Sequence, residues 1–184
     1  METNTDDIKM VLPTLKYKNQ AEEFIRECYE YESDIHGVGS LDTYLRESYY
    51  ESWLDKIHSD VDIANIKDGK VPSLTYFYVR ESDNRIVGMV NIRLALNEFL
   101  STEGGHIGYS IRPSERRKGY AVSMLSKALK VLKVIGVKDA IVTCGKDNKA
   151  SAKTIQKCGG QLDSEFYSKT FDEIIQRYII KLGD

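Results

Sequence analysis

The spacing of apolar residues predicts a strand–helix–strand unit in the second half of the chain. Residues 105–111 alternate between apolar and other side chains, which is typical of a strand. Residues 121–135 carry apolar side chains at helical spacing along one face, and Gly136 ends that helix. Residues 140–144 form a short apolar, β-rich segment, which suits a buried strand beside the first one.

A second helix continues this unit. Asp147 and Asn148 open the helix, and Gly159 and Gly160 close it. The unit therefore runs from strand to loop to helix, and then from a second strand to a capped helix.

The remaining pattern predicts further strands and helices. One helix is expected over 19–31, and another begins after Ser40 as N-cap and reaches at least Trp53. In one strand, Asn91 and Arg93 share a face and apolar residues occupy the other face. The expected strands cover residues 8–12, 74–79, 86–96, 162–167 and 174–182, and the last two form a hairpin. We therefore expect a single α/β domain over residues 1–184, built on a mixed sheet.

The loop of the strand–helix–strand unit, residues 112–119, carries the most information. It holds four cationic side chains and one glutamate before Gly119. A loop that ends at a helix N-terminus offers unpaired backbone N–H groups and the positive end of the helix dipole, which suit phosphate oxygens. Gly119 allows the backbone to approach such an anion without an intervening side chain.

Two common phosphate motifs do not fit this loop. It lacks Gly-x-x-x-x-Gly-Lys-Ser/Thr, so a mononucleotide P-loop is disfavoured, and it lacks Gly-x-Gly-x-x-Gly, so a dinucleotide site is disfavoured too. A basic, solvated connection with a glycine at its turn would have the same local composition. The elements on both sides shift the interpretation toward a phosphate site.

Composition limits the class of protein. The chain has 184 residues and a formal net charge of −2, which disfavours a general role in nucleic-acid binding. Cys28, Cys144 and Cys158 lack the spacing of a metal site and are odd in number, so we expect free thiols and no metal. No apolar segment is long enough to span a membrane, and the N-terminus is not signal-like. These features predict a soluble cytoplasmic protein.

The loop and the start of its helix resemble a known motif. Arg116-x-x-Gly119-x-Ala121 matches Arg/Gln-x-x-Gly-x-Gly/Ala, the acetyl-CoA signature of the GNAT superfamily of N-acetyltransferases. Alone, this match would be a moderate signal.

A second motif follows at the spacing of the same family. Residues 147–159, with Asn148 and Ser151, are similar to the family's Asn-x-x-Ser/Ala motif that ends in Gly-Phe. The resemblance covers about residues 75–182 and, more weakly, residues 8–12. The nearest branch resembles the ribosomal-protein alanine acetyltransferases.

The resemblance implies an α/β, GNAT-like fold and binding of acetyl-CoA without a metal. That fold has a mixed, mostly antiparallel central sheet with a splayed parallel strand pair and flanking helices. The acetyl-CoA-binding core would lie at about 75–182, and the N-terminal helices at about 15–70 would shape the acceptor site. The residues implied to bind acetyl-CoA are Ile111, Arg112, Arg116, Arg117, Lys118, Gly119, Tyr120, Ala121, Asn148, Ser151 and Lys153.

Several of these residues also have ordinary structural explanations. The charges at 116–118 could be mainly solvated, because the family's key phosphate donors are main-chain amides. Asn148 could cap its helix, Ser151 could be a small residue in the first helical turn, and Lys153 could be an exposed lysine. The resemblance favours Ser151 near the sulfur or the pantetheine.

The chain departs from the family pattern in its second motif. Many members have a tyrosine one turn after the serine or alanine, as the acid that protonates the leaving thiolate, but this chain has Ile155 there. The final Gly-Phe is Gly159-Gly160. The identity of the acid is therefore open, and Ser151 is our candidate because it lies one turn before Ile155 on the same helical face.

The general base and the acceptor pocket have candidates on the two adjacent strands. His106 begins the strand that should hold the thioester, and Glu103 lies beside it, so either could act as base through water. Either could equally be an ordinary residue at a glycine turn. Asn91 and Arg93 could line the acceptor pocket or form an exposed face.

Two functions follow. The first is an enzyme that transfers acetyl to a primary amine by direct attack in a ternary complex, with a small-molecule amine, a peptide N-terminus or a lysine as acceptor. The second is a coenzyme-A-binding sensor or interaction domain without catalysis, which the missing tyrosine motivates. We expect no nucleic-acid or membrane partner, and a homodimer is one option for the assembly.

Overall fold

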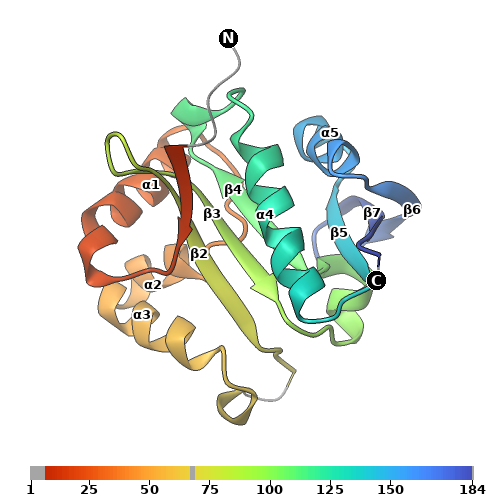
Figure 1. Ribbon diagram of the computed structural model, residues 1–184, viewed down its shortest axis with the longest axis horizontal. Helices are drawn as coiled ribbons and strands as arrows, with labels where there is room; N and C mark the ends of the chain where they lie inside the picture. The colour runs from red at the N-terminus through yellow and green to blue at the C-terminus, as the bar shows by residue number, and fades with distance from the viewer. Residues whose placement is uncertain (1–6, 67–68, 184) are drawn as a thin grey trace.

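The computed structural model describes residues 7–66 and 69–183, with helices on both sides of two neighbouring sheets (Figure 1). Its strands are β1 (Ile8–Val11), β2 (Ser73–Arg80), β3 (Arg85–Arg93), β4 (Ile107–Ile111), β5 (Asp139–Gly145), β6 (Gln161–Ser168) and β7 (Glu173–Lys181). Its α-helices are α1 (Lys18–Glu30), α2 (Leu41–Glu47), α3 (Tyr50–Ser59), α4 (Tyr120–Val134) and α5 (Lys149–Lys157). The predicted α/β class and the C-terminal hairpin are confirmed.

The strands form two antiparallel ladders that meet at one point. One sheet has the order β1-β2-β3-β4, and the other has the order β5-β7-β6. Strands β4 and β5 run in the same direction (Figure 1). They meet where the backbone N–H of His106 donates to the Ile141 carbonyl oxygen at 2.7 Å, and beyond that point they share no ladder. This is the expected splayed pair, and the gap between its strands positions the candidate site.

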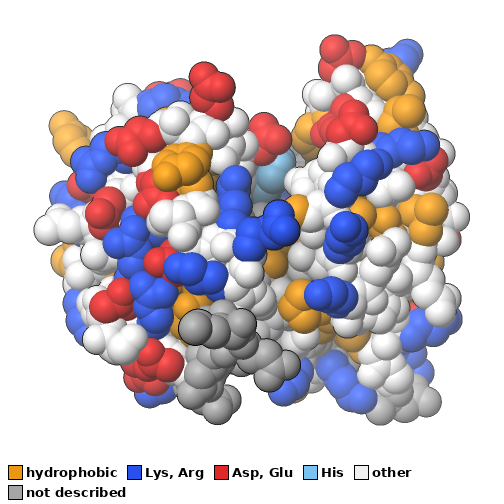
Figure 2. Space-filling view, turned by 90° about the horizontal axis from the view of Figure 1, so that it is seen from above, with side chains coloured by type: hydrophobic (Ala, Val, Ile, Leu, Met, Phe, Trp, Pro, Cys, Tyr) orange, Lys and Arg blue, Asp and Glu red, His pale blue; other side chains and the backbone are white. Residues whose placement is uncertain are grey.

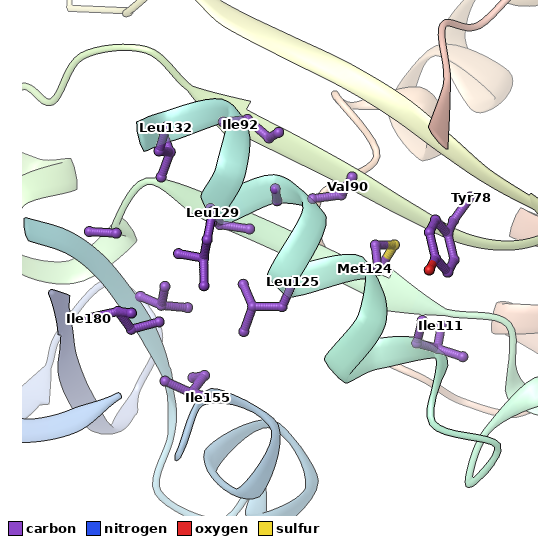
Figure 3. Packing of buried hydrophobic residues seen from close by; sticks show 14 of the residues in the cluster. Tyr78, Val90, Ile92, Ile111, Met124, Leu125, Leu129, Leu132, Ile155 and Ile180 are labelled. Atoms are coloured by element: carbon purple, nitrogen blue, oxygen red, sulfur yellow. The ribbon is translucent and has the colours of Figure 1, made fainter. Parts of the chain in front are cut away.

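Helices bury apolar side chains against both faces of the first sheet. Helix α4 presents Met124, Leu125 and Leu129 to a cluster that includes Val90 of β3 and Ile180 of β7 (Figure 3). Helices α1, α2 and α3 form a second cluster with residues of β2 and β3. Each fully buried leucine contributes about 1.5–3 kcal/mol of transfer free energy, so the first cluster, which includes residues of β4 and β5, holds these two strands in place.

Two predicted elements differ from the structure. The helix expected after Ser40 is divided into α2 and α3, because Ser48 leaves the helical conformation with φ −154°. Ser40 itself has φ +67° and makes no side-chain cap. The strand expected to reach residue 96 ends at Arg93, because the Asn97 side chain accepts the N–H of Leu100 at 2.8 Å and turns the chain into a helical segment.

Candidate active site

The loop before α4 presents a row of free backbone N–H groups. Arg117 and Gly119 have φ values of +66° and +82°, and such left-handed turns direct neighbouring N–H groups into a concave site for anions. Within the described part of the chain, no group accepts a hydrogen bond from the backbone N–H groups of residues 117–121. A Cβ placed at Gly119 would meet no atom within 4 Å. The loop thus combines open space, free donors and a helix dipole, which fits phosphate oxygens.

The cationic side chains of this loop differ in their partners. Lys118 forms an ion pair with the buried Glu115 at 2.8 Å, and Arg116 donates from Nε to the Ile111 carbonyl oxygen at 3.3 Å. Arg117 is exposed and has no ion pair with any described residue. Arg117 is therefore the side chain of the three that is free to approach a phosphate.

Two predicted cofactor residues have enclosed side chains. Arg112 is completely buried, and its guanidinium lies 3.0 Å from Glu27 Oε2 and donates to the Ile86 carbonyl oxygen at 2.7 Å. Tyr120 is 3% exposed, and its hydroxyl accepts a hydrogen bond from Arg80 at 3.2 Å. Only the backbones of these two residues are available to a ligand.

The edge of β4 that faces β5 is open. The backbone N–H of Arg112 donates to the Val87 carbonyl oxygen of β3 at 2.9 Å. The alternation of the antiparallel ladder therefore turns the N–H groups of Gly108 and Ser110 toward β3 and those of Tyr109 and Ile111 to the other side. Because β5 does not pair with β4 there, these groups face the gap between the two strands. An extended ligand with amide groups can add to such an edge.

A tyrosine from β4 spans this gap. The Tyr109 hydroxyl lies 2.9 Å from the Ser151 Oγ in the first turn of α5. Ile155, where many family members have a tyrosine, is completely buried in the core. A phenol therefore reaches the gap from β4, although the expected position on α5 carries none.

Burial controls the ionisation of this tyrosine. Desolvation raises the pKa of Tyr109 to about 12, and the hydrogen bond with Ser151 opposes the shift. The phenol is thus protonated at neutral pH and can donate a proton. Tyr109 is not among the sequence-based candidates, because it shares a strand face with Ile107 and Ile111, and this pattern indicates packing.

The remaining residues of the second motif lie at the start of α5. Asn148 accepts the backbone N–H of Ser151 on its side-chain oxygen at 3.0 Å, so it caps the helix. Lys153 is exposed, and Ser151 is partly buried. The structure therefore brings Ser151 to the gap, while Asn148 fixes the helical turn that carries it.

His106 joins the two splayed strands. Its Nδ1 accepts the backbone N–H of Ile141 at 2.9 Å, and its own backbone N–H donates to the Ile141 carbonyl oxygen. Burial lowers the pKa of His106 below 6.5, and the charge of Arg93 adds to this effect. A neutral ring that accepts at Nδ1 carries its proton on Nε2 and has no free lone pair. This geometry corrects the expectation of a general base at His106 and gives the residue a structural role.

Glu103 lies in the helical segment Leu100–Gly104 that precedes β4. Its carboxylate accepts the Ser168 hydroxyl at 2.6 Å, and its carbonyl oxygen accepts the Thr143 hydroxyl at 2.7 Å. These bonds attach the segment to β5 and β6. A role of Glu103 as general base stays a prediction.

The other predicted acceptor residues line an open pocket on the opposite face of the first sheet. Asn91, which is 9% exposed, and Arg93 contribute to a pocket of about 450 Å³ together with the segment 35–40 and residues of α3. The alternative of an exposed strand face is therefore wrong for Asn91. The pocket also contains Leu100, next to the segment that leads into β4.

Exposed cations surround the hollow between the two sheets. Viewed from above, Lys and Arg side chains gather on both of its sides (Figure 2). The loop contributes exposed residues 116–118, and α5 contributes exposed Lys149 and Lys153. No group of His, Cys, Asp or Glu in the described ranges is arranged to hold a metal. None of the described helices has the length and apolar character needed to cross a membrane.

Comparison with protein families identifies the architecture. A model of the acetyltransferase (GNAT) domain matches residues 13–161 of this chain. The chain belongs to the GNAT acetyltransferase family. The predicted family and an N-acetyltransferase class of enzyme are confirmed, and the loop before α4 lies within the matched range.

Solved structures show the same fold at low sequence identity. A microcin C7 self-immunity acetyltransferase, MccE, in complex with acetyl-CoA and AMP, has a TM-score of 0.68 and 20% identity, covering 96% of this chain and 93% of that chain. The ribosomal-protein-S5-alanine acetyltransferase from Vibrio fischeri has a TM-score of 0.74 and 14% identity, covering 97% and 94%. RimJ from Mycobacterium smegmatis, in complex with CoA-disulfide, has a TM-score of 0.70 and 12% identity, covering 95% and 82%.

No curated protein matches the chain significantly. The likeness to the ribosomal-protein branch therefore rests on the fold and on the motifs.

Proposed function

We propose that this GNAT acetyltransferase transfers the acetyl group of acetyl-CoA to a primary amine by direct attack in a ternary complex. The observation that carries this proposal is the loop at 117–121, whose free backbone N–H groups lie at the positive end of α4. MccE is described in complex with acetyl-CoA and has the same fold, which supports the choice of cosubstrate.

Different residues around the gap would bind different parts of acetyl-CoA. The N–H groups of residues 117–121 would hold the pyrophosphate, with Arg117 as an additional cation and Lys153 near the adenosine phosphate. The open edge of β4 at Tyr109 and Ile111 would pair with the pantetheine. Ser151 would lie next to the sulfur.

Acetyl-CoA supplies an activated thioester, and the chain supplies orientation and a proton. The amine nitrogen bonds to the carbonyl carbon, the carbon–sulfur bond breaks, and the nitrogen loses a proton to solvent. A backbone N–H at the edge of β4 stabilises the oxyanion. Tyr109, which burial holds in its protonated form, donates its proton to the leaving thiolate and regains one from solvent, and Ser151 orients the phenol.

Tyr109 supplies the phenol that is missing from α5, where this chain has Ile155. A sensor without catalysis was motivated by the missing tyrosine on α5, but Tyr109 places a phenol beside Ser151 from the other side of the gap. The acceptor would be a small-molecule amine or a peptide N-terminus or lysine that enters through the pocket at Asn91 and Arg93. A cytoplasmic location, a homodimer, and the division into a core at 75–182 and acceptor helices at 15–70 stay predictions.

A thiol-release assay tests this function. The purified protein is incubated with acetyl-CoA and a panel of primary amines and peptides, and free coenzyme A is measured against a control without amine. We expect amine-dependent release together with an acetylated amine detected by mass spectrometry. Tight binding of acetyl-CoA without release for any amine would instead support a sensor.

A further inference from the structure

Arg93 is a largely enclosed cation at the C-terminal end of β3. Its Nη1 donates to the carbonyl oxygens of Gly104 and Gly105 at 2.8 and 2.9 Å. Burial lowers the pKa of Arg93, which shows that its charge is poorly solvated. Carbonyl oxygens solvate part of a guanidinium, but they leave its net positive charge in place.

No carboxylate of the described residues lies within 4 Å of Arg93. This separates it from the other buried cations: Arg112 is paired with Glu27 at 3.0 Å, and Arg80 with Glu115 at 2.8 Å. The N–H groups on Nε and Nη2 of Arg93 donate to no described residue. Among the described residues, neither nitrogen belongs to the fully buried side-chain atoms that lack a hydrogen-bond partner. These donors are therefore open to the space that Arg93 lines.

That space is the pocket of about 450 Å³ described above. Arg93 borders β4 there, because its Nη2 is 3.7 Å from a Cβ placed at Gly108 in the middle of that strand. Gly37, which also lines the pocket, contacts the backbone of Gly108 so closely that a Cβ there would meet the Gly108 carbonyl oxygen at 2.0 Å. The open donors of Arg93 thus lie next to the strand that should hold the thioester.

The same pocket wall has an acceptor beside these donors. Asn91 uses its Nδ2 to donate to Ser73 and Thr75 at 3.1 Å each, which leaves its Oδ1 without a donor among the described residues. Asn91 pairs with Gly108 in the sheet, so this oxygen also lies near β4. An ammonium or amine group is a suitable donor for it, while an anion suits Arg93.

We propose that this pocket binds an acceptor amine that carries an anionic group, a carboxylate or a phosphate, and that Arg93 holds this group by charge-assisted hydrogen bonds. The inference rests on the proposed function for the position of the thioester. Because Arg93 is adjacent to β4, the anion and the reacting amine belong to one small molecule and are separated by only a few bonds. Planar guanidinium donors favour two oxygens at once, which both anions offer.

Matched pairs of acceptors test the proposal. Thiol release is measured for alanine against alaninamide, 4-aminobutyrate against butylamine, and phosphoethanolamine against ethanolamine. We expect the anionic member of at least one pair to have a kcat/KM at least tenfold higher, in line with hydrogen bonds to charged groups. The carboxylate and phosphate pairs distinguish the two sources of the anion. Equal values within every pair would overturn the proposal.

Substitution of Arg93 tests whether its side chain recognises the anion of the acceptor or only supports the backbone at Gly104 and Gly105. Arg93→Gln should remove the preference, because kcat/KM falls at least tenfold more for the anionic member than for its uncharged counterpart. Arg177→Gln is a matched control, because Arg177 also donates to a carbonyl of the segment before β4, Ser101 at 3.0 Å, but is paired with Asp163. Arg177→Gln should keep the higher kcat/KM for the anionic member of the pair. An equal loss for both members of a pair would show that Arg93 only supports the fold. If Arg93→Gln does not fold, Arg93→Lys should retain a reduced preference.

A binding measurement keeps this inference distinct from the proposed function. Succinate, as an anion without an amine, is titrated into the parent and Arg93→Gln, and the melting temperature is recorded. We expect succinate to stabilise the parent more than the variant. If no amine is acetylated but this difference is found, the proposed function fails and the anion site stands. Equal stabilisation of both proteins would overturn the anion site.

Discussion

The Tyr109 hydroxyl on β4 lies 2.9 Å from the Ser151 Oγ on α5, across the gap where β4 and β5 separate. This contact joins the open strand edge to the helix that carries the family's second motif. It brings a protonated phenol to the place where the thiolate should leave, although α5 has an isoleucine at the usual tyrosine position.

Tyr109→Phe should slow turnover by more than tenfold while acetyl-CoA still binds. Removal of the hydroxyl raises the barrier by at least about 1.4 kcal/mol if it is the proton donor. Steady-state kinetics and calorimetry measure the two effects. Tyr178→Phe is the control, because Tyr178 belongs to the same core cluster and, among the described residues, its hydroxyl donates only to Gln176, at 2.9 Å. If Tyr109→Phe turned over at the parental rate, water would be the donor of the proton to the leaving thiolate.

Ser151→Ala should also slow turnover by more than tenfold and retain coenzyme A binding. Because Ser151 acts through Tyr109 in our mechanism, the double variant with Tyr109→Phe should be little slower than either single variant. A multiplicative loss in the double variant would show that the two hydroxyls act independently.

Gly119→Glu should keep the fold and lose acetyl-CoA binding. The carboxylate would enter the open space before the loop, where two like charges about 4 Å apart repel by roughly 4 kcal/mol near a protein surface. After screening, affinity should fall on the order of a hundredfold. Calorimetry measures the affinity, and circular dichroism confirms the fold.

Gly136→Glu is the matched control for this change. Gly136 has φ +87°, like the φ +82° of Gly119, and a Cβ there also meets no atom within 4 Å. Both variants therefore carry a similar backbone strain of about 1–2 kcal/mol. Only Gly119→Glu should lose affinity, and equal affinities would remove the phosphate site.

Stability should fall as the pH drops below about 6.5, partly because of His106. Its pKa is lowered in the folded protein, so the unfolded chain binds more protons in this range. The free energy of unfolding therefore rises with pH between the folded and the unfolded pKa, by at most about 1.4 kcal/mol per pH unit for one group. Urea unfolding at pH 5.5 and pH 7.5 measures this dependence.

His106→Asn isolates the contribution of this side chain. The asparagine oxygen can replace Nδ1 as acceptor for Ile141, but it does not titrate in this range. We expect a weaker pH dependence for the variant than for the parent. Parallel curves would show that other groups cause the effect.

Arg112→Met should destabilise the protein by about 3–5 kcal/mol, because it leaves the Glu27 carboxylate without its buried partner. Acetyl-CoA affinity should change little, since the Arg112 side chain is enclosed. Denaturant unfolding and calorimetry measure the two quantities. Unchanged stability with lost affinity would return Arg112 to the cofactor site.

The sequence was sufficient for the features that depend on near neighbours in the chain. The order of elements from residue 105 to residue 160, the helix that starts after Gly119 and the cap at Asn148 are all encoded within a few residues, because backbone hydrogen bonds and dipoles act locally. The proposed phosphate loop is a site of this kind, since its donors are consecutive amides. Its predicted position before α4 therefore required no knowledge of distant contacts.

Only the tertiary structure decided what the side chains around that loop do. Arg112 and Glu27 are 85 positions apart, and Tyr109 and Ser151 are 42 apart, so neither pairing is visible in a local pattern. Chain reversals bring these groups together, and burial then sets their protonation and partners. Arg112 became part of a buried ion pair, and His106 connects two strands. Tyr109 reaches the gap because β4 and β5 diverge, and Arg93 lines the pocket because the segment 35–40 crosses that face of the sheet.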